Sequence, residues 1–125
     1  MSRGGMKSQT VENSVVGLGG NQFETGVVSV PANSTLKKGA VLKRNGAKFE
    51  VVSLMSAETP VVVNPFDIEN SGSAAADMSL RAIISGPVRA DLLLVGDQKT
   101  TDVQNDMIRS YGIIPIKVND ISRTN

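Results

Sequence analysis

The stretch that decides the fold reads AVLKRNGAKFEVVS and covers Ala40–Ser53. Two runs with β-strand composition flank the dipeptide Asn45 and Gly46. Asn-Gly favours a two-residue hairpin loop of type I′, in which both central residues take positive φ. The stretch therefore predicts two antiparallel strands joined by a tight turn.

The loop length also predicts which residues lie opposite each other in this hairpin. With Asn45 and Gly46 as the loop, Leu42 would face Phe49, and Arg44 would face Ala47. Because side chains alternate along a strand, one face of the hairpin would then be apolar and the other polar. The predicted buried face carries Ala40, Leu42, Ala47, Phe49 and Val51, and the predicted wet face carries Lys43, Lys48 and Glu50.

Short β-rich runs broken by turn residues surround the hairpin. Gly39 supplies a turn into the first hairpin strand, with Leu36 as a core contact before it. The turn pair Gly86 and Pro87 separates two further runs, and Pro115, which lacks an amide donor, predicts a sheet edge. The expected strands are 25–30, 60–64, 80–85, 88–95 and 113–118, with an exposed loop at 70–77.

One helix interrupts the β pattern. Thr101 followed three residues later by Gln104 forms a capping box, which marks a helix start. Val103, Met107 and Tyr111 recur at fourfold spacing and predict the buried side of this helix. Gly112 then provides its stop.

The first 24 residues differ from the rest of the chain. They contain five glycines among Ser, Asn and Gln, and their only apolar cluster is Val15, Val16 and Leu18. Such a composition buries too little apolar surface to form a core. The sequence predicts a mainly β fold, a small barrel or sandwich with one short helix in residues 25–125, preceded by an extended N-terminal arm in residues 1–24 that folding does not require.

Composition argues against most chemistry. The 125 residues include neither cysteine nor histidine, the commonest metal ligands and nucleophile partners. A net charge of +1 and four aromatic residues give a poor basis for nucleic-acid binding. No apolar run has the length of a membrane span, and the first ten residues lack the apolar stretch of a signal peptide. We expect no enzyme, no cofactor, no metal, no nucleic-acid partner and no membrane.

Three motifs invite a chemical reading and have simpler explanations. The glycines of Gly17–Gly20 lack the strand before and the helix after that a phosphate-binding loop needs. Asp102 and Asp106 lie four apart on the helix, where a first-turn carboxylate and a solvated carboxylate are expected. Asp91 reads as surface charge on a strand.

Three stretches together resemble the lambda-type phage head decoration proteins. They are Thr35–Leu42, the region from Asp67 and Ile68 through Leu80–Val95, and Met107–Ile114, whose order along the chain carries the likeness. The resemblance implies a β-tulip domain that binds the outside of the expanded phage head as a homotrimer at threefold sites. Its partner would be the major capsid protein, and its role would be to stabilise the shell against the pressure of packaged DNA.

In that family the N-terminal arm orders on the capsid through backbone pairing. The resemblance therefore assigns capsid binding to residues 1–24, with Val15, Val16, Leu18 and Phe23 as the apolar contacts. It also implies that the protein is made in the host cytoplasm and resides on the outer surface of the virion.

Two other functions fit the same residues. A tail-tube or head-tail joining subunit would also be β-rich and poor in catalytic residues, but it would form rings instead of trimers. Residues 34–42 are also similar in sequence to a segment of lipoyl- and biotinyl-type carrier domains. Carriers place their modified lysine at a hairpin tip, however, and the predicted tip here is Asn45 and Gly46.

Overall fold

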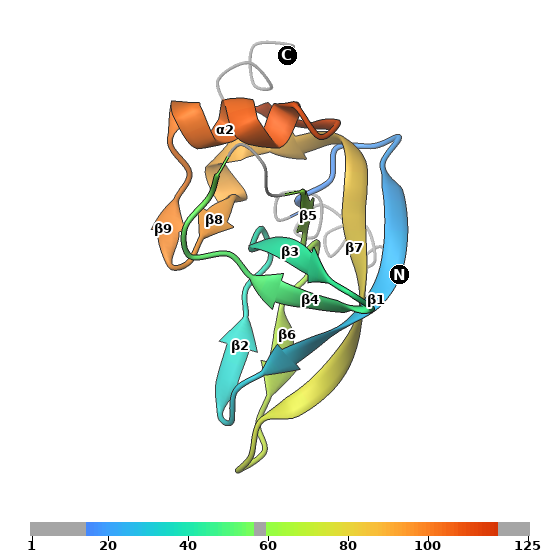
Figure 1. Cartoon of the computed structure of the whole chain (residues 1–125), viewed down its shortest axis with the longest axis vertical. Helices are drawn as coiled ribbons and strands as arrows, with labels where there is room; N and C mark the ends of the chain where they lie inside the picture. Colours follow the sequence, from blue (N-terminus) through green and yellow to red (C-terminus); the bar gives the residue numbers. More distant parts are fainter. Residues whose placement is uncertain (1–14, 57–59, 118–125) are drawn as a thin grey trace, which may run out of the picture.

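Five strands pair around a closed ring in the computed structural model, which describes residues 15–56 and 60–117 (Figure 1). The predicted fold class is confirmed: the chain is mainly β, with a closed five-stranded barrel and a single short α-helix in the described part. The elements in chain order are β1 (Gln22–Val30), β2 (Ser34–Leu36), β3 (Val41–Asn45), β4 (Lys48–Val51), β5 (Val61–Val63), β6 (Ile68–Asn70), β7 (Ala76–Arg89), the 3₁₀ turn η1 (Ala90–Leu92), β8 (Leu94–Val95), β9 (Gln98–Lys99), α2 (Asp102–Arg109) and β10 (Ile113–Ile116).

The ring runs in the order β1, β4, β3, β5 and β7, and the pairing of β7 with β1 closes it. That closing pairing is antiparallel and extends from Gln22 opposite Ser85 to Val30 opposite Ala76. β10 adds a sixth strand, parallel to the last residues of β7 and at the edge of the sheet. Pro115 lies in this edge strand, as its missing amide donor predicts.

The two hairpin strands form as predicted, but the predicted register differs from the observed one by two residues. Asn45 pairs with Lys48, and Leu42 lies opposite Val51 instead of Phe49. The loop is Gly46 and Ala47, and only Gly46 has a positive φ, of 67°. A glycine at the first central position is the pattern of a type II′ turn, so the turn does not need Asn45 in the left-handed region.

A shift of two residues preserves which face each side chain occupies. Leu42 and Phe49 are therefore buried as predicted, although they are diagonal neighbours and not a directly opposed pair. Val51 is 46% exposed, which corrects its assignment to the core. Ala47 is exposed in the turn, so its assignment to the buried face is also wrong. The residues predicted to face water, Lys43, Lys48 and Glu50, are exposed.

The strand β7 corrects the prediction of two strands split by a turn. It continues for 14 residues through Gly86 and Pro87 to Arg89. Gly86 bends it with a φ of 101°, while β10 pairs alongside from Gly86 onward and holds the second half in the sheet. The expected loop at 70–77 also shrinks, because β6 ends at Asn70 and β7 begins at Ala76.

The barrel interior takes apolar side chains from all five strands. Its members are Val28, Val30, Ala40, Leu42, Phe49, Val62, Leu80 and Ala82. The Phe49 ring occupies the space over Gly26 of β1, where an added Cβ would lie 2.3 Å from the ring. A glycine at this position is thus what lets the largest interior side chain fit.

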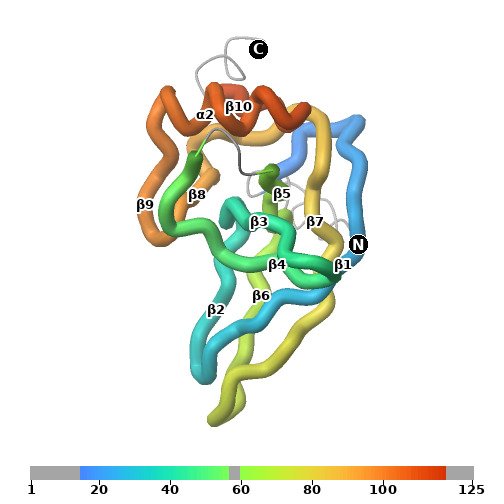
Figure 2. Tube along the Cα trace, in the orientation of Figure 1, coloured from blue at the N-terminus to red at the C-terminus, as the bar shows by residue number. Residues whose placement is uncertain are grey.

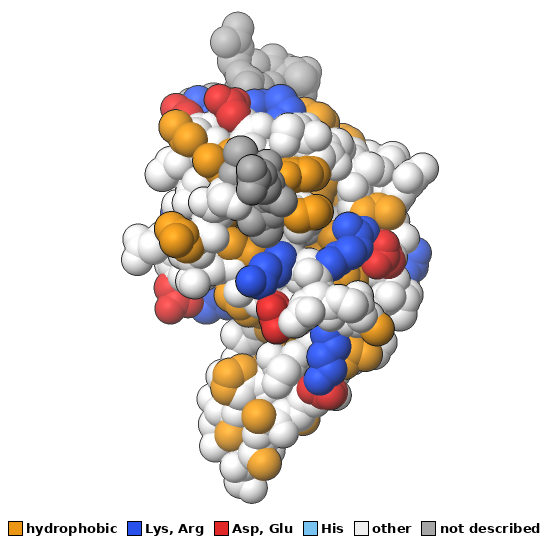
Figure 3. Space-filling view, viewed as in Figure 1, with side chains coloured by type: hydrophobic (Ala, Val, Ile, Leu, Met, Phe, Trp, Pro, Cys, Tyr) orange, Lys and Arg blue, Asp and Glu red, His pale blue; other side chains and the backbone are white. Residues whose placement is uncertain are grey.

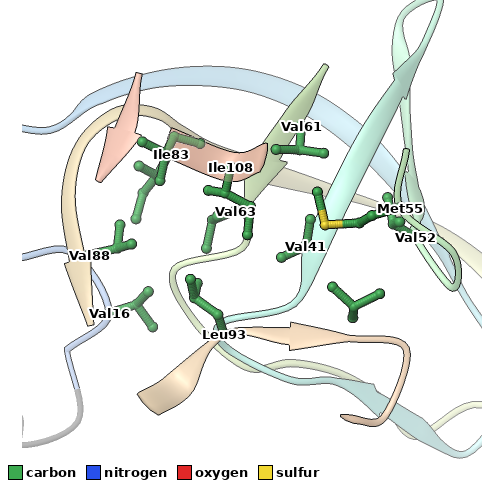
Figure 4. Close-up of a cluster of buried hydrophobic side chains, with 12 residues drawn as sticks. Val16, Val41, Val52, Met55, Val61, Val63, Ile83, Val88, Leu93 and Ile108 are labelled. Atoms are coloured by element: carbon green, nitrogen blue, oxygen red, sulfur yellow. The ribbon is translucent and has the colours of Figure 1, made fainter. Parts of the chain in front are cut away.

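A second core lies on the outer side of β3, β5 and β7. Its members are Val16, Val41, Val52, Met55, Val61, Val63, Ile83, Val88, Leu93, Val95, Ile108 and Ile113 (Figure 4). Val61 and Val63 belong to this core while Val62 points into the barrel, so β5 is buried on both faces and its uninterrupted valine run is explained.

Helix α2 covers this second core. Its capping box is confirmed, since Thr101 Oγ1 accepts from the Gln104 amide and Gln104 Oε1 accepts from the Thr101 amide. The buried side of the helix is Asn105 and Ile108, flanked by the partly buried Met107 and Tyr111. Val103 is 64% exposed, so the predicted buried stripe is wrong at that residue.

A projecting finger extends from the barrel opposite to α2 (Figures 1 and 2). It consists of the paired strands β2 and β6 with the adjoining ends of β1 and β7. The side chain of Asn70, which is 6% exposed, donates to the carbonyls of Val30, Pro31 and Ala74 and so ties these strands together. Figure 3 shows charged side chains of both signs across the visible face of the barrel and none at the finger tip.

An ion pair bridges β1 and β3 at one rim of the barrel. Arg44 forms a two-bond fork on Glu24, with Nη2 to Oε1 at 2.6 Å and Nε to Oε2 at 3.1 Å. Hydrogen bonding to Arg44 holds the pKa of the Glu24 carboxyl below its ordinary value. Because the folded pKa is depressed, the pair stabilises the fold above the ordinary carboxyl range, and this contribution is lost as pH falls through the folded pKa.

We predict that Phe49→Ala lowers the free energy of unfolding by about 3 to 5 kcal/mol, because it empties the barrel interior beside Gly26. Lys48→Ala, at the neighbouring exposed position, removes only an exposed ion pair with Asp77 and should cost less than about 1 kcal/mol. Urea unfolding of both variants measures the difference. Equal, small losses would contradict the assigned interior.

We predict that Arg44→Met raises the pKa of Glu24 toward its ordinary value, because the hydrogen bonds that favour the carboxylate are gone. NMR titration of the Glu24 carboxyl carbon measures this. Stability of the wild type should exceed that of the variant at neutral pH, and the gap should close in acid. A Glu24 pKa that is the same in both proteins would contradict the pairing.

Candidate functional site

The segment before β1 packs onto the end of β7 as a short extra strand. Arg89 donates its amide to the carbonyl of Val16 at 2.9 Å, and Leu18 donates its amide to the carbonyl of Pro87 at 3.0 Å. Gly17 forms an antiparallel bridge with Val88 between these two bonds. The Val16 side chain is fully buried and points into the second core near Val88 and Leu93 (Figure 4).

Asn21 fixes the path of this segment where β7 bends. Its amide nitrogen donates to the carbonyls of Ser85 and Pro87, at 3.2 and 2.9 Å. Its amide oxygen accepts from the Gly19 amide at 3.0 Å. The Asn21 side chain thus adds a hydrogen bond on each side of Gly86, where β7 bends.

These contacts place the described part of the predicted arm inside the folded domain. Val16 is a core residue, and Phe23 lies in β1, which begins at Gln22, three residues earlier than predicted. The reason lies in contacts with distant residues: Val16 packs in the second core with Val88 and Leu93, and Asn21 donates to the carbonyls of Ser85 and Pro87. Residues 1–14 of the predicted arm lie outside the described residues.

An apolar hollow of about 260 Å³ opens beside this segment. We refer to it as the N-terminal hollow. Phe66, which is 65% exposed, and Phe23, which is 39% exposed, are its two aromatic walls. Its lining residues are Val15, Val16, Gly17, Gly19, Gly20, Asn21, Phe23, Pro65, Phe66 and Ile83. Leu18, which is 37% exposed, lies in the same segment but does not line the hollow.

The N-terminal hollow also has a positive side. The guanidinium of Arg81 lies over the Phe23 ring, with Cζ 4.8 Å from the ring centroid. This cation–π contact fixes the ring orientation. A ligand in the hollow would therefore meet two aromatic side chains and glycine backbone, while Arg81 contacts the Phe23 ring without lining the hollow. That combination suits an apolar peptide segment, since backbone and side chains can both be contacted.

Of the four residues predicted as capsid contacts, three are available at the surface. Val15 and Phe23 line the N-terminal hollow, and Leu18 is exposed beside it, whereas Val16 points inward. Phe66 was missed. Its only sequence signal was an aromatic residue between Pro65 and Asp67 in a connection, where no core position was expected.

The carboxylates singled out in the sequence each have a cationic neighbour. Asp102 lies 3.7 Å from Lys117, and Asp106 lies 2.6 Å from Arg109. Asp91 lies in the 3₁₀ turn η1 and not in a strand as predicted, because β7 ends at Arg89, with which Asp91 pairs at 2.8 Å. Among residues 15–56 and 60–117, no group of three or more acidic side chains is placed to hold a metal ion.

The glycine run 17–20 does not form a phosphate-binding loop, because it leads into β1 and not into a helix. Gly19 and Gly20 take positive φ, and a Cβ added to either would meet no atom within 4 Å. Their role is therefore to form the turn before β1. No helix in the described part of the chain is long and apolar enough to cross a membrane.

Comparison with models of known protein families gives no match, and comparison with curated proteins finds no relative.

We predict that deleting residues 1–14 leaves the melting temperature nearly unchanged, whereas deleting residues 1–24 lowers it strongly. The longer deletion removes the buried Val16, the Asn21 hydrogen bonds and the start of β1, at a cost of at least about 3 kcal/mol. Thermal unfolding followed by circular dichroism measures both. A matched pair refines the test: Val16→Ala should cost about 2 kcal/mol and Leu18→Ala little. Identical melting of the two deletions would contradict this packing.

Proposed function

We propose that this protein is a decoration protein of a phage head. It binds the outer surface of the expanded capsid as a trimer at threefold sites and stabilises the shell against the pressure of packaged DNA. The proposal rests on the sequence resemblance in three ordered stretches and on a β-barrel fold compatible with it. Under this proposal the protein performs no catalysis, and its partner is the major capsid protein.

The observation that carries the proposal is the N-terminal hollow. Exposed aromatic side chains are costly to leave in water, and Phe66 is 65% exposed beside the partly exposed Phe23. The chain preceding Val15 joins the barrel at this same place, since Val15 lines the hollow. A capsid segment that fills the hollow would therefore contact Val15, the residue that follows 1–14 in the chain.

The composition of residues 1–14 suits binding through the backbone. The segment is mainly polar and small, with Val11 its only β-branched aliphatic residue. Backbone pairing with a capsid strand demands little of side chains, and each bond contributes about 1 kcal/mol net. Three such arms in a trimer engage a fixed lattice, so avidity can raise binding about a hundredfold without a tight single site.

Stabilisation follows from selective binding. A ligand stabilises only the state that it binds, by an amount that grows with its concentration relative to Kd. If the threefold sites form only in the expanded shell, each bound copy opposes both contraction and rupture of that shell.

We predict that Phe66→Ser weakens binding to expanded capsids by at least about tenfold, through the loss of about 1.5 to 3 kcal/mol of apolar burial. Val103→Ser is the matched control, because Val103 is 64% exposed on α2 and does not line the hollow. Co-sedimentation of each variant with expanded capsids that lack the protein measures binding, and thermal unfolding verifies that both variants fold. Equal binding of the two variants would contradict the assigned surface.

The stabilising role is tested on the same particles. Saturating wild-type protein should raise the temperature at which the capsids release DNA. Unchanged release despite saturated binding would contradict the stabilising role. Sedimentation of the protein, free and released from capsids, tests the trimer against the rings expected of a tail-tube or joining subunit.

A further inference from the structure

The hairpin tip carries an asparagine whose surroundings favour a covalent change. Asn45 is the last residue of β3 and Gly46 is the first of the turn, and both are exposed. Gly46 has no side chain of its own, and a Cβ built on it would meet no atom within 4 Å, so no neighbouring group crowds the turn on that side. In the described turns and loops the Gly46 amide donates no backbone hydrogen bond.

We propose that Asn45 is a site of spontaneous deamidation in the folded protein. The Gly46 amide nitrogen loses its proton to hydroxide and attacks Cγ of Asn45, so a new nitrogen–carbon bond closes a five-membered succinimide. The bond from Cγ to Nδ2 breaks, and the nitrogen leaves as ammonia after taking a proton from water. Water then opens the ring at either carbonyl, giving an aspartyl or an isoaspartyl residue.

The open position of Gly46 is what makes this step accessible. A residue with a side chain after Asn45 would shield the attacking nitrogen, and glycine does not. The Asn45 amide donates from Nδ2 to Glu50 Oε2 at 3.0 Å, and this contact is exposed. A single exposed hydrogen bond contributes only about 1 kcal/mol, so it breaks readily and frees the amide group for attack at Cγ.

Asn70 provides the contrast within the same chain. It is also followed by a small residue, Ser71, but it is only 6% exposed. Its amide nitrogen donates to three backbone carbonyls, and its amide oxygen accepts from the Gly72 amide at 2.9 Å. These bonds must break before the side chain can adopt the geometry of attack, so the fold protects Asn70.

Deamidation would change the electrostatics of the hairpin. The new carboxylate would stand about where Nδ2 now donates to Glu50, so an attraction would become a repulsion between like charges. Lys43, at 3.9 Å from Glu50, would offset part of it. The isoaspartyl form would also lengthen the backbone at Asn45, which pairs with Lys48 to close the turn.

The test incubates the purified full-length protein at mildly alkaline pH and physiological temperature and follows each position by peptide mass mapping. Enzymatic methylation of isoaspartyl groups gives a second readout. Conversion at position 45 should exceed that at position 70 by about a hundredfold, because four hydrogen bonds protect the Asn70 amide. In concentrated urea the ratio should fall, since the protection of Asn70 is lost.

Absence of conversion at position 45 in the folded protein would overturn the proposal, as would a ratio that urea does not change. A variant series tests the consequence without waiting for the reaction. Asn45→Asp should lower the melting temperature at neutral pH, and the loss should shrink in a Glu50→Gln background. An equal loss in both backgrounds would show that the new charge does not act on Glu50.

Discussion

The antiparallel pairing of β1 with β7 is the contact on which the rest of the molecule depends. It joins the first strand of the domain to a strand some fifty residues later, from Gln22 opposite Ser85 to Val30 opposite Ala76, and thereby closes the ring. Because the ring is closed, strands surround the interior side chains of Phe49, Leu42 and their neighbours. Pairing over such a sequence distance carries a loop-closure cost, which the two apolar cores must offset.

The same pairing sets the position of the N-terminal hollow. β1 enters the ring beside the bend of β7 at Gly86, and the residues just before β1 are drawn onto the far end of that strand. Asn21 stabilises the crossing, and Val16 fills the second core. Phe23 and Phe66 are thereby left facing outward at the point where residues 1–14 join the barrel, which is why we propose this surface for capsid binding.

The sequence was sufficient for the fold class, the hairpin and the helix start, because each depends on local chemistry. The Asn45-Gly46 turn signal, the alternation through Leu42 and Phe49, and the capping box of Thr101 and Gln104 all act within a few residues. The assignment of Leu42 and Phe49 to the buried face of the hairpin is correct in spite of the register error. A shift of two residues leaves every side chain on the same face of the sheet.

The predictions that were wrong depend on contacts between distant segments. Gly86 and Pro87 have the composition of a turn, and they belong to a continuous strand because β10 and the residues before β1 both bond to this part of β7. Val16 belongs by composition to a glycine-rich arm, and its burial depends on Val88 and Leu93, which are more than seventy residues away in the chain. Val103 has the helical spacing of a core residue, but the helix rests on Asn105 and Ile108. Phe66 became a candidate contact only when the fold brought it next to Phe23.

The edge strand β10 has a consequence for how copies of this chain behave when crowded together. Strands inside the closed ring have partners on both sides and cannot pair with a strand of another molecule. β10 is the strand at the end of the six-stranded sheet. Pro115 removes one donor from that edge, and Arg109 donates to the Pro115 carbonyl at 3.3 Å, occupying one acceptor. Lateral growth of the sheet from molecule to molecule is thus discouraged at its outermost strand, so dense packing need not lead to aggregation.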